Sequence, residues 1–156
     1  MDIGSKCGYP ACALSNFAPH PFVIDGVKCN SMEGFLQSLK FKEILIQEEV
    51  CKLVGSKAKY RGKPKKWYEN QTLYWRGVEY KRDSKEYQEL LDRAYYELSC
   101  NSGFRDALIA THGATLTHSI GKSNISETVL TKREFCGRLT KIRERLILEK
   151  ENESET

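Results

Sequence analysis

Apolar residues recur at the spacing of a helix face in three separate segments, and this pattern constrains the fold more than any other feature. A repeat at three and four positions lets one side of a helix pack on a core. The pattern predicts helices over about 31–53, about 84–99 and from 131 onward. The three apolar stripes are Met32, Phe35, Leu36 and Leu39; Tyr87, Leu90, Leu91, Ala94, Tyr95 and Leu98; and Phe135, Leu139, Ile142 and Leu146.

Capping residues support these helices. Ser31 offers an N-cap to the first, and Asp83 with Glu86 and Thr131 with Glu134 have capping-box spacing at the other two. A shorter helix is expected near 102–111, closed by Gly113 in the C-cap position.

The strand content is small. FVIDGVKC at 22–29 has two β-prone runs around Asp25-Gly26, which predicts a tight hairpin. QTLYWRGVEYK at 71–81 predicts a short strand or turn, and 55–71 and 114–130 read as irregular loops. With 156 residues and 40% hydrophobic content, we expect residues 1–156 to form one predominantly helical α+β domain ending in an acidic tail at 146–156.

Several classes of protein are disfavoured. No run approaches the roughly 20 apolar residues of a membrane span, and the N-terminus lacks an apolar signal segment, so a cytoplasmic protein without a membrane partner is expected. The six cysteines form no Cys-x-x-Cys pair and the three histidines are scattered, so neither a metal nor a cofactor is expected.

The sequence lacks the complete form of several common nucleotide-binding and hydrolase motifs. Gly121-Lys122-Ser123 resembles the end of a phosphate-binding loop, but Leu116 occupies the position of the required first glycine. No Gly-x-Gly-x-x-Gly or Gly-x-Ser-x-Gly motif is present, which argues against the common dinucleotide fold and the serine-hydrolase elbow.

Charge is distributed unevenly along the chain. Residues 52–82 hold ten Lys and Arg against two Glu, a local +8 within a chain of net charge +4. The 57–68 basic loop interleaves these cations with Tyr60, Trp67 and Tyr68. Phosphate contacts with ring stacking would suit a nucleotide or a single strand of nucleic acid. The alternative is an ordinary solvated lysine-rich surface.

The first predicted helix carries a polar row beside its apolar stripe. Glu33, Gln37 and Lys40 recur at helical spacing. A row at the edge of a buried face can present a carboxylate to a binding site, although Glu33 in a first helical turn also suits the helix dipole.

A run of motif residues lies in the opening segment: Ser15, Asn16, Phe17, Pro19, Phe22, Asp25, Gly26, Ser31, Glu33, Gln37, Lys40 and Phe41. This run resembles the signature of the NADAR family, the YbiA-like N-glycosidases. Trp67, the segment LSCNSGFRDALIATHG, and Gly137, Leu139 and Arg143 continue the resemblance, which spans about 14–145.

The chain departs from the family pattern at two places. Gly34 follows Glu33 where the family usually has histidine. The acidic segment ending in Trp-Gly is replaced by LTHSIGKSNISETVL, with His118 where a glutamate would stand and Glu127 as a candidate replacement for the lost aspartate.

The resemblance implies a YbiA-like fold and cleavage of an N-glycosidic bond to ribose phosphate. It makes Glu33 the catalytic carboxylate, with His118 as a second catalytic candidate. The residues expected to bind the substrate are Asn16, Phe17, Lys40, Arg61, Trp67 and Trp75. Of these, Phe17, Trp67 and Trp75 are the candidates for an aromatic wall.

Three functions remain open on the sequence. The favoured one is removal of ADP-ribose from a modified guanine in nucleic acid, because a local +8 exceeds what one monophosphate needs. The second is hydrolysis of a phosphoribosyl-amine intermediate of riboflavin synthesis. The third, from a different class, is a non-catalytic module that binds ADP-ribose, NAD or nucleic acid.

Overall fold

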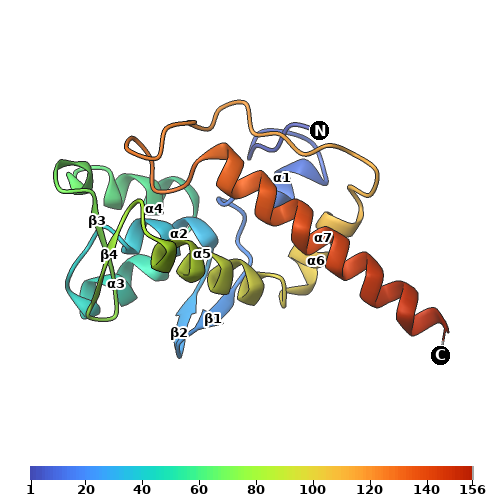
Figure 1. Cartoon of the computed structure of the whole chain (residues 1–156), viewed down its shortest axis with the longest axis horizontal. Coiled ribbons are helices and arrows are strands. Elements are labelled where there is room, and N and C mark those ends of the chain that lie inside the picture. The colour runs from blue at the N-terminus through green and yellow to red at the C-terminus, as the bar shows by residue number, and fades with distance from the viewer. Residues whose placement is uncertain (156) are drawn as a thin grey trace.

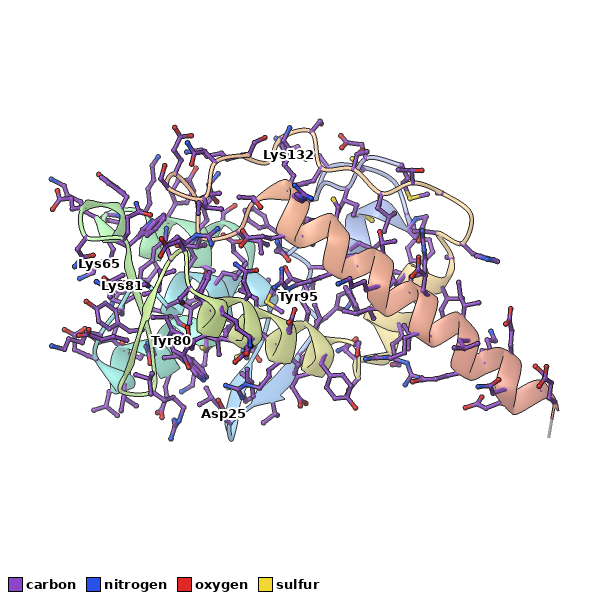
Figure 2. The ribbon with its side chains drawn as sticks, viewed as in Figure 1. Asp25, Lys65, Tyr80, Lys81, Tyr95 and Lys132 are labelled. Carbon is purple, nitrogen blue, oxygen red and sulfur yellow. The ribbon has the colours of Figure 1, made fainter. Side chains whose placement is uncertain are left out.

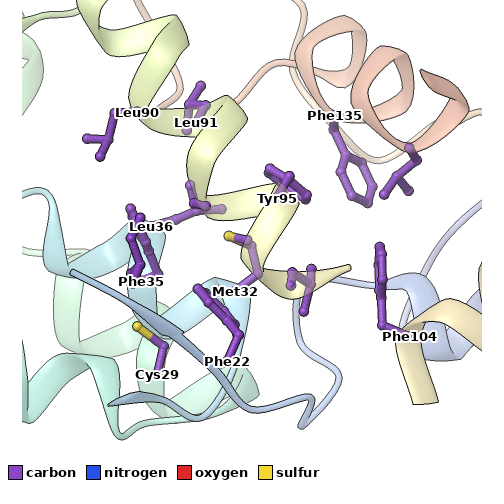
Figure 3. Close-up of a cluster of buried hydrophobic side chains, with 14 of the residues drawn as sticks. Phe22, Cys29, Met32, Phe35, Leu36, Leu90, Leu91, Tyr95, Phe104 and Phe135 are labelled. Atoms are coloured by element: carbon purple, nitrogen blue, oxygen red, sulfur yellow. The ribbon is translucent and has the colours of Figure 1, made fainter. Parts of the chain in front are cut away.

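Helix α5 (Lys85–Leu98) contributes six buried side chains to the hydrophobic core. The computed structural model describes residues 1–155, and Figure 1 shows the long helix α7 (Lys132–Glu155) running across them. Tyr95 of α5 faces Phe135 of α7 with ring centroids 6.2 Å apart (Figure 3). Leu90 and Leu91 of α5 join the same buried cluster as helix α2 (Met32–Ser38). The core therefore lies where α2, α5 and α7 meet.

Seven α-helices and two antiparallel hairpins make up the described chain, which confirms the α+β class. None of its helices has the length and apolar character needed to cross a membrane. The remaining elements are α1 (Ala11–Leu14), β1 (Phe22–Ile24), β2 (Val27–Cys29), α3 (Ile44–Cys51), α4 (Gly55–Gly62), a 3₁₀ turn η1 (Trp67–Glu69), β3 (Thr72–Trp75), β4 (Val78–Lys81) and α6 (Ser102–Ile109).

Both hairpins use two-residue turns with positive φ angles. Asp25 and Gly26 have φ 49° and 77°, so the hairpin predicted at 22–29 is confirmed with Phe22 opposite Cys29. The segment predicted as a strand or turn is a second hairpin, in which Arg76 and Gly77 adopt φ 49° and 86°. Such turns match the right-handed twist of the strands they connect.

The single helix predicted over 31–53 is wrong, because the chain breaks between α2 and α3. The break is held by tertiary hydrogen bonds that the local sequence does not reveal. The Tyr74 N–H donates to the Leu39 carbonyl at 2.8 Å. The buried Gln47 amide donates to the carbonyls of Phe41 and Tyr74, both at 2.8 Å. The Tyr74 N–H of β3 and the Gln47 side chain thus pair backbone carbonyls that a continuous helix would have paired internally.

The prediction of an irregular loop at 55–71 is also wrong. Residues 55–62 form α4, and 67–69 form η1. Glycine and proline lower the helical propensity of this stretch, but α4 packs on α2 and buries Ala58 and Gly62. Tertiary packing therefore outweighs local propensity, while the lysines of α4 stay exposed.

The later helices start at side-chain caps. The N-cap of α5 is Ser84, whose hydroxyl accepts the Tyr87 N–H at 3.1 Å, rather than the predicted Asp83. The predicted capping box of α7 is confirmed: Thr131 N–H donates to Glu134 at 2.8 Å, and Glu134 N–H donates to the Thr131 hydroxyl at 3.1 Å.

The ends of the two last helices also differ from expectation. Helix α6 ends at Ile109, and Gly113 follows with φ 87°. Residues 146–155, expected as an acidic tail, continue α7 as a helix with Leu146 buried, and residue 156 lies outside the described residues. The end of α7 extends beyond the rest of the molecule (Figure 1).

A buried arginine joins β4, the 114–130 loop and α7. Arg82 is 1% exposed, and its guanidinium donates two hydrogen bonds to Glu134, at 2.6 and 3.1 Å. Its Nε donates to the Thr128 carbonyl at 2.8 Å. Burial alone would raise the pKa of Glu134, but hydrogen bonds from Arg82, the Thr131 backbone and Gln88 hold it below its ordinary value.

We expect Glu134→Ala to lower the free energy of unfolding by about 3–5 kcal/mol, because it leaves the Arg82 charge buried without a counterion. Urea denaturation of both proteins measures this loss. Glu144→Ala, an exposed glutamate on the same helix, is the matched control and should change stability by no more than about 0.5 kcal/mol. Equal losses for the two variants would contradict a structural role for the pair.

Candidate functional site

The N-terminus of α2 fixes the position of Glu33. The Ser31 hydroxyl accepts the Gly34 N–H at 3.0 Å and donates to the Leu53 carbonyl at 2.9 Å. The Glu33 N–H donates to the Asn16 carbonyl at 3.0 Å. Two segments distant in sequence therefore hold the first turn of this helix.

Gly34 has a steric reason to stand where the NADAR family usually has histidine. A Cβ on Gly34 would lie 2.7 Å from the Leu53 carbonyl oxygen and 3.0 Å from that of Val50. Glycine lets α2 approach the C-terminal end of α3 this closely, so a larger residue here would force the two elements apart.

Glu33 is a half-buried carboxylate surrounded by polar and cationic groups. Burial raises the pKa of Glu33 above its ordinary value. A hydrogen bond of 2.9 Å from the Gln37 amide and the nearby charges of Lys40, Lys59 and His118 oppose that effect. We call these five residues the Glu33 cluster. It gathers α2, α4 and the 114–130 loop around one carboxylate.

Gln37 is the uncharged member of the cluster and is held tightly. It is 7% exposed, and its Oε1 makes no hydrogen bond within the described residues. A Cβ on Gly62 of α4 would overlap that oxygen and lie 2.9 Å from the Gln37 Cδ. Gly62 thus provides the space in which the Gln37 amide can point its N–H toward Glu33.

Two lysines adjoin Glu33 from different elements. Burial lowers the pKa of Lys40, the positive charge of Lys122 lowers it further, and Glu33 opposes both. Lys59 projects from α4 and is exposed. Lys40, Lys59 and Lys122 together provide cationic groups for an anion bound near Glu33.

His118 reaches the cluster from the 114–130 loop. Its Nδ1 lies 2.7 Å from the Ile3 carbonyl, and its ring meets the ring of Phe135 edge-on at 5.2 Å. Because a carbonyl only accepts, we assign the proton to Nδ1, which leaves Nε2 as an acceptor in the neutral ring. The Ile3 N–H in turn donates to the Thr117 carbonyl at 2.8 Å, so the N-terminus fixes this loop.

Asn16 and Phe17 border the same site. The Asn16 side-chain oxygen accepts the buried Tyr95 hydroxyl at 2.7 Å, and no hydrogen bond within residues 1–155 uses its amide N–H groups. Phe17 is half-buried, and its ring lies 3.7 Å from the position of a Cβ on Gly55. Phe17 is therefore the aromatic candidate with accessible ring surface.

The two tryptophans cannot form the aromatic wall expected from the sequence. Trp75 is 2% exposed, stacks on Phe35 with centroids 4.9 Å apart, and donates its indole N–H to Asp25 at 2.8 Å. Trp67 is also buried in the core cluster. Both rings stabilise the fold, and neither offers an open face to a ligand.

Arg61, also expected to bind the substrate, lies on the surface of α4. It is exposed at the end of α4, with its guanidinium 4.7 Å from the centre of the Phe41 ring. Lys59, from the same helix, is the cation that acts on Glu33. Glu127 is exposed in the 114–130 loop and is not among the groups that shift Glu33.

Helical spacing in the sequence predicts the polar row of Glu33, Gln37 and Lys40, but no local signal places Lys59 or Lys122 beside that row. Only the path of the chain brings α4 and the 114–130 loop to α2. Within residues 1–155, no three His, Cys, Asp or Glu side chains gather as a metal site.

Comparisons with known proteins agree with one another. The family model described as bacteriophage protein GP30.3 matches residues 8–144. A 17.1 kDa protein from the Gp30–rIII intergenic region of Enterobacteria phage T4 is 40% identical over 149 residues, 94% of this chain and 98% of the relative. The NMR structure of the E. coli protein YbiA has a TM-score of 0.62 at 20% identity, over 96% of this chain and 86% of YbiA. The last likeness confirms the YbiA-like fold.

We expect Gly62→Ala to destabilise the protein by about 1–3 kcal/mol, because the new methyl group must displace the buried Gln37 amide. Gly137→Ala is the matched control: a Cβ on this exposed glycine of α7 meets no atom within 4 Å. It should stabilise the helix by about 0.5–1 kcal/mol. Urea denaturation of both variants tests this, and equal effects would mean that Gly62 imposes no constraint on Gln37.

Proposed function

The chain belongs to the bacteriophage protein GP30.3 family and has the fold of YbiA, and we therefore propose that it is an N-glycosidase. Its substrate would be a ribosyl phosphate. The favoured reaction removes ADP-ribose from an ADP-ribosylated guanine in nucleic acid. The proposal rests on the environment of Glu33, whose carboxylate is partly removed from solvent and has cationic side chains around it.

The reaction needs a negative group beside the ribose C1. The C1–N bond breaks, its electron pair stays on the base nitrogen, and the sugar acquires oxocarbenium character. Glu33 stabilises that positive charge and takes a proton from the water whose oxygen bonds to C1. Because burial raises the pKa of Glu33, its carboxylate is a stronger base than that of an ordinary glutamate.

The neighbouring groups fit the other parts of such a substrate. Lys40, Lys59 and Lys122 would hold the phosphates by charge-assisted hydrogen bonds. Phe17 would contact the base, and the free Asn16 amide would donate to the sugar or base edge. His118 would donate a proton or hydrogen bond to the leaving base when protonated.

The choice of substrate rests on charge. Exposed cations of α4 and the segment after it extend the positive surface away from Glu33; Figure 2 labels Lys65 and, on β4, Lys81. A nucleic-acid strand attached to the ADP-ribose would use these cations, whereas a phosphoribosyl-amine has one phosphate to hold. The riboflavin-pathway substrate is therefore the second candidate.

A non-catalytic module is the competing proposal from a different class, because the family's acidic Trp-Gly segment is absent. Incubation with ADP-ribosylated guanosine and with ADP-ribosylated DNA separates the two. An enzyme releases free ADP-ribose, whereas a binding module protects the bond and releases none.

We expect Glu33→Gln to lower the hydrolysis rate by roughly 10²-fold or more with little change in ligand affinity. The amide keeps the shape of the side chain but removes the charge that the transition state requires. Single-turnover rates and a separate binding titration measure the two effects. Glu127→Gln serves as the control and should keep the normal rate, since Glu127 is exposed outside the Glu33 cluster.

The pH dependence gives a second readout of the same role. Hydrolysis requires ionised Glu33, so its rate should fall on the acid side at a pH above the ordinary pKa of glutamate. Lys59→Ala removes a charge that favours the ionised form and should move this fall to higher pH. A Glu33→Gln protein with normal turnover would remove Glu33 from the mechanism.

We expect replacement of Lys63, Lys65 and Lys66 by Ala to weaken binding of an ADP-ribosylated oligonucleotide far more than binding of free ADP-ribose. A polynucleotide releases more counterions on binding, so its affinity falls more steeply with salt. A salt titration with both ligands measures the two slopes. An equal charge change elsewhere is the control, made at the exposed lysines Lys6, Lys28 and Lys150. Equal losses for both ligands would limit this surface to a mononucleotide.

A further inference from the structure

A second candidate binding site lies between hairpin β1–β2, helix α5 and helix α7. The pocket there has a volume of about 550 Å³, within the range of small-molecule sites. None of its lining residues belongs to the Glu33 cluster. Figure 2 labels Asp25 at the tip of the hairpin and Tyr95 on α5, two of the lining residues. The pocket therefore calls for an explanation separate from the proposed hydrolysis.

The pocket has an apolar floor and an aromatic rim. Ile24, Tyr95 and Ile142 line it, and each is at most 9% exposed. The Tyr96 ring on the rim is 54% exposed, with the Arg145 guanidinium 4.9 Å from its centre. A flat apolar ring fits this combination, because it covers the floor and can stack beside Tyr96.

Three acidic residues line the pocket, and two of them, Asp25 and Asp92, form ion pairs with arginines, whereas the third is Glu97. Arg93 donates to Asp25 at 2.8 Å, and Arg138 Nε lies 2.9 Å from an Asp92 carboxylate oxygen. These pairs neutralise that part of the pocket wall. The first pair also joins the hairpin to α5, and the second joins α5 to α7.

Lys141 supplies unpaired positive charge to the pocket wall, and Arg145 supplies a second cation that has an ion pair with Glu149. Lys141 is exposed and has no ion-pair or hydrogen-bond partner within residues 1–155. Arg145 donates to the Ser99 hydroxyl at 2.8 Å, but its Nε is 3.5 Å from Glu149 and makes no hydrogen bond. Four positions apart on α7, the two cations lie on the same helix face.

We propose that this pocket binds a flat aromatic molecule with one anionic group, of the size of a nucleoside monophosphate. The ring lies over Ile24 and Ile142 beside Tyr96, and the anion meets Lys141 and Arg145. The proposal does not depend on hydrolysis at Glu33.

The test is a titration of the full-length protein with adenosine 5′-monophosphate, followed through backbone amide NMR signals. Saturable shifts are expected at residues 92–97 and 138–145. Adenosine alone and inorganic phosphate alone should each bind at least about tenfold more weakly, because each lacks one of the two recognition elements.

Substitutions then locate the site. Lys141→Glu and Tyr96→Ala should each weaken binding of adenosine 5′-monophosphate by about tenfold. Lys150→Glu makes the same charge change at an exposed position of α7 outside the pocket and should leave the affinity unchanged within about twofold. The amide spectra of the variants also report whether each still folds.

The proposal is overturned if no saturable shift occurs at millimolar ligand, if the shifts fall only around the Glu33 cluster, or if Lys141→Glu and Lys150→Glu bind alike. Equal affinity for inorganic phosphate would overturn it too, since that makes the pocket a simple anion site. Shifts confined to Glu33, Lys40, Lys59 and Lys122 would leave the proposed hydrolase function intact. Conversely, a protein that binds adenosine 5′-monophosphate at 92–97 and 138–145 but hydrolyses no N-glycosidic bond would contradict the hydrolase proposal alone.

Discussion

The buried ion pair between Arg82 and Glu134 joins β4 to the start of α7 and to the loop before it. A charge buried this deeply is tolerated only when an opposite charge and hydrogen-bond acceptors surround it. Satisfying Arg82 therefore requires the start of α7 and the Thr128 carbonyl to lie beside β4. That requirement fixes one end of the 114–130 loop, and the same loop brings His118 near Glu33 and Lys122 near Lys40.

Burial of Glu33 makes the folding stability of the protein depend on pH. Because burial raises the pKa of Glu33, the folded protein binds its proton more tightly than the unfolded chain does. Folding stability from this group is thus present at low pH and is lost as the pH rises through the folded pKa. Above that pKa, ionised Glu33 lowers the folding stability, whereas an isosteric amide would not. Carboxylates with a shifted pKa are common at functional sites, in keeping with the role proposed for Glu33.

The elements that the sequence predicted well are those whose signals are local. The Asp25-Gly26 hairpin and the Thr131–Glu134 capping box depend on a few adjacent residues, and both are present as expected. The break after Ser38 and helix α4 were missed for the opposite reason. Tyr74 and Gln47 stabilise the first, and packing against α2 stabilises the second, so in each case the decisive partner is distant in sequence.

Local patterns in the sequence predicted the α+β class and the row of Glu33, Gln37 and Lys40, because periodicity is a property of neighbouring residues. The resemblance to the NADAR signature predicted the YbiA-like fold. The cations that adjoin Glu33 are brought there by the packing of distant segments, and the same packing buries Trp75 in the core, where it cannot line a ligand site. The pocket between α5 and α7 likewise exists only in the folded chain. Desolvation, proximity of charges and cavities arise from segments that fold together, and no local pattern encodes them.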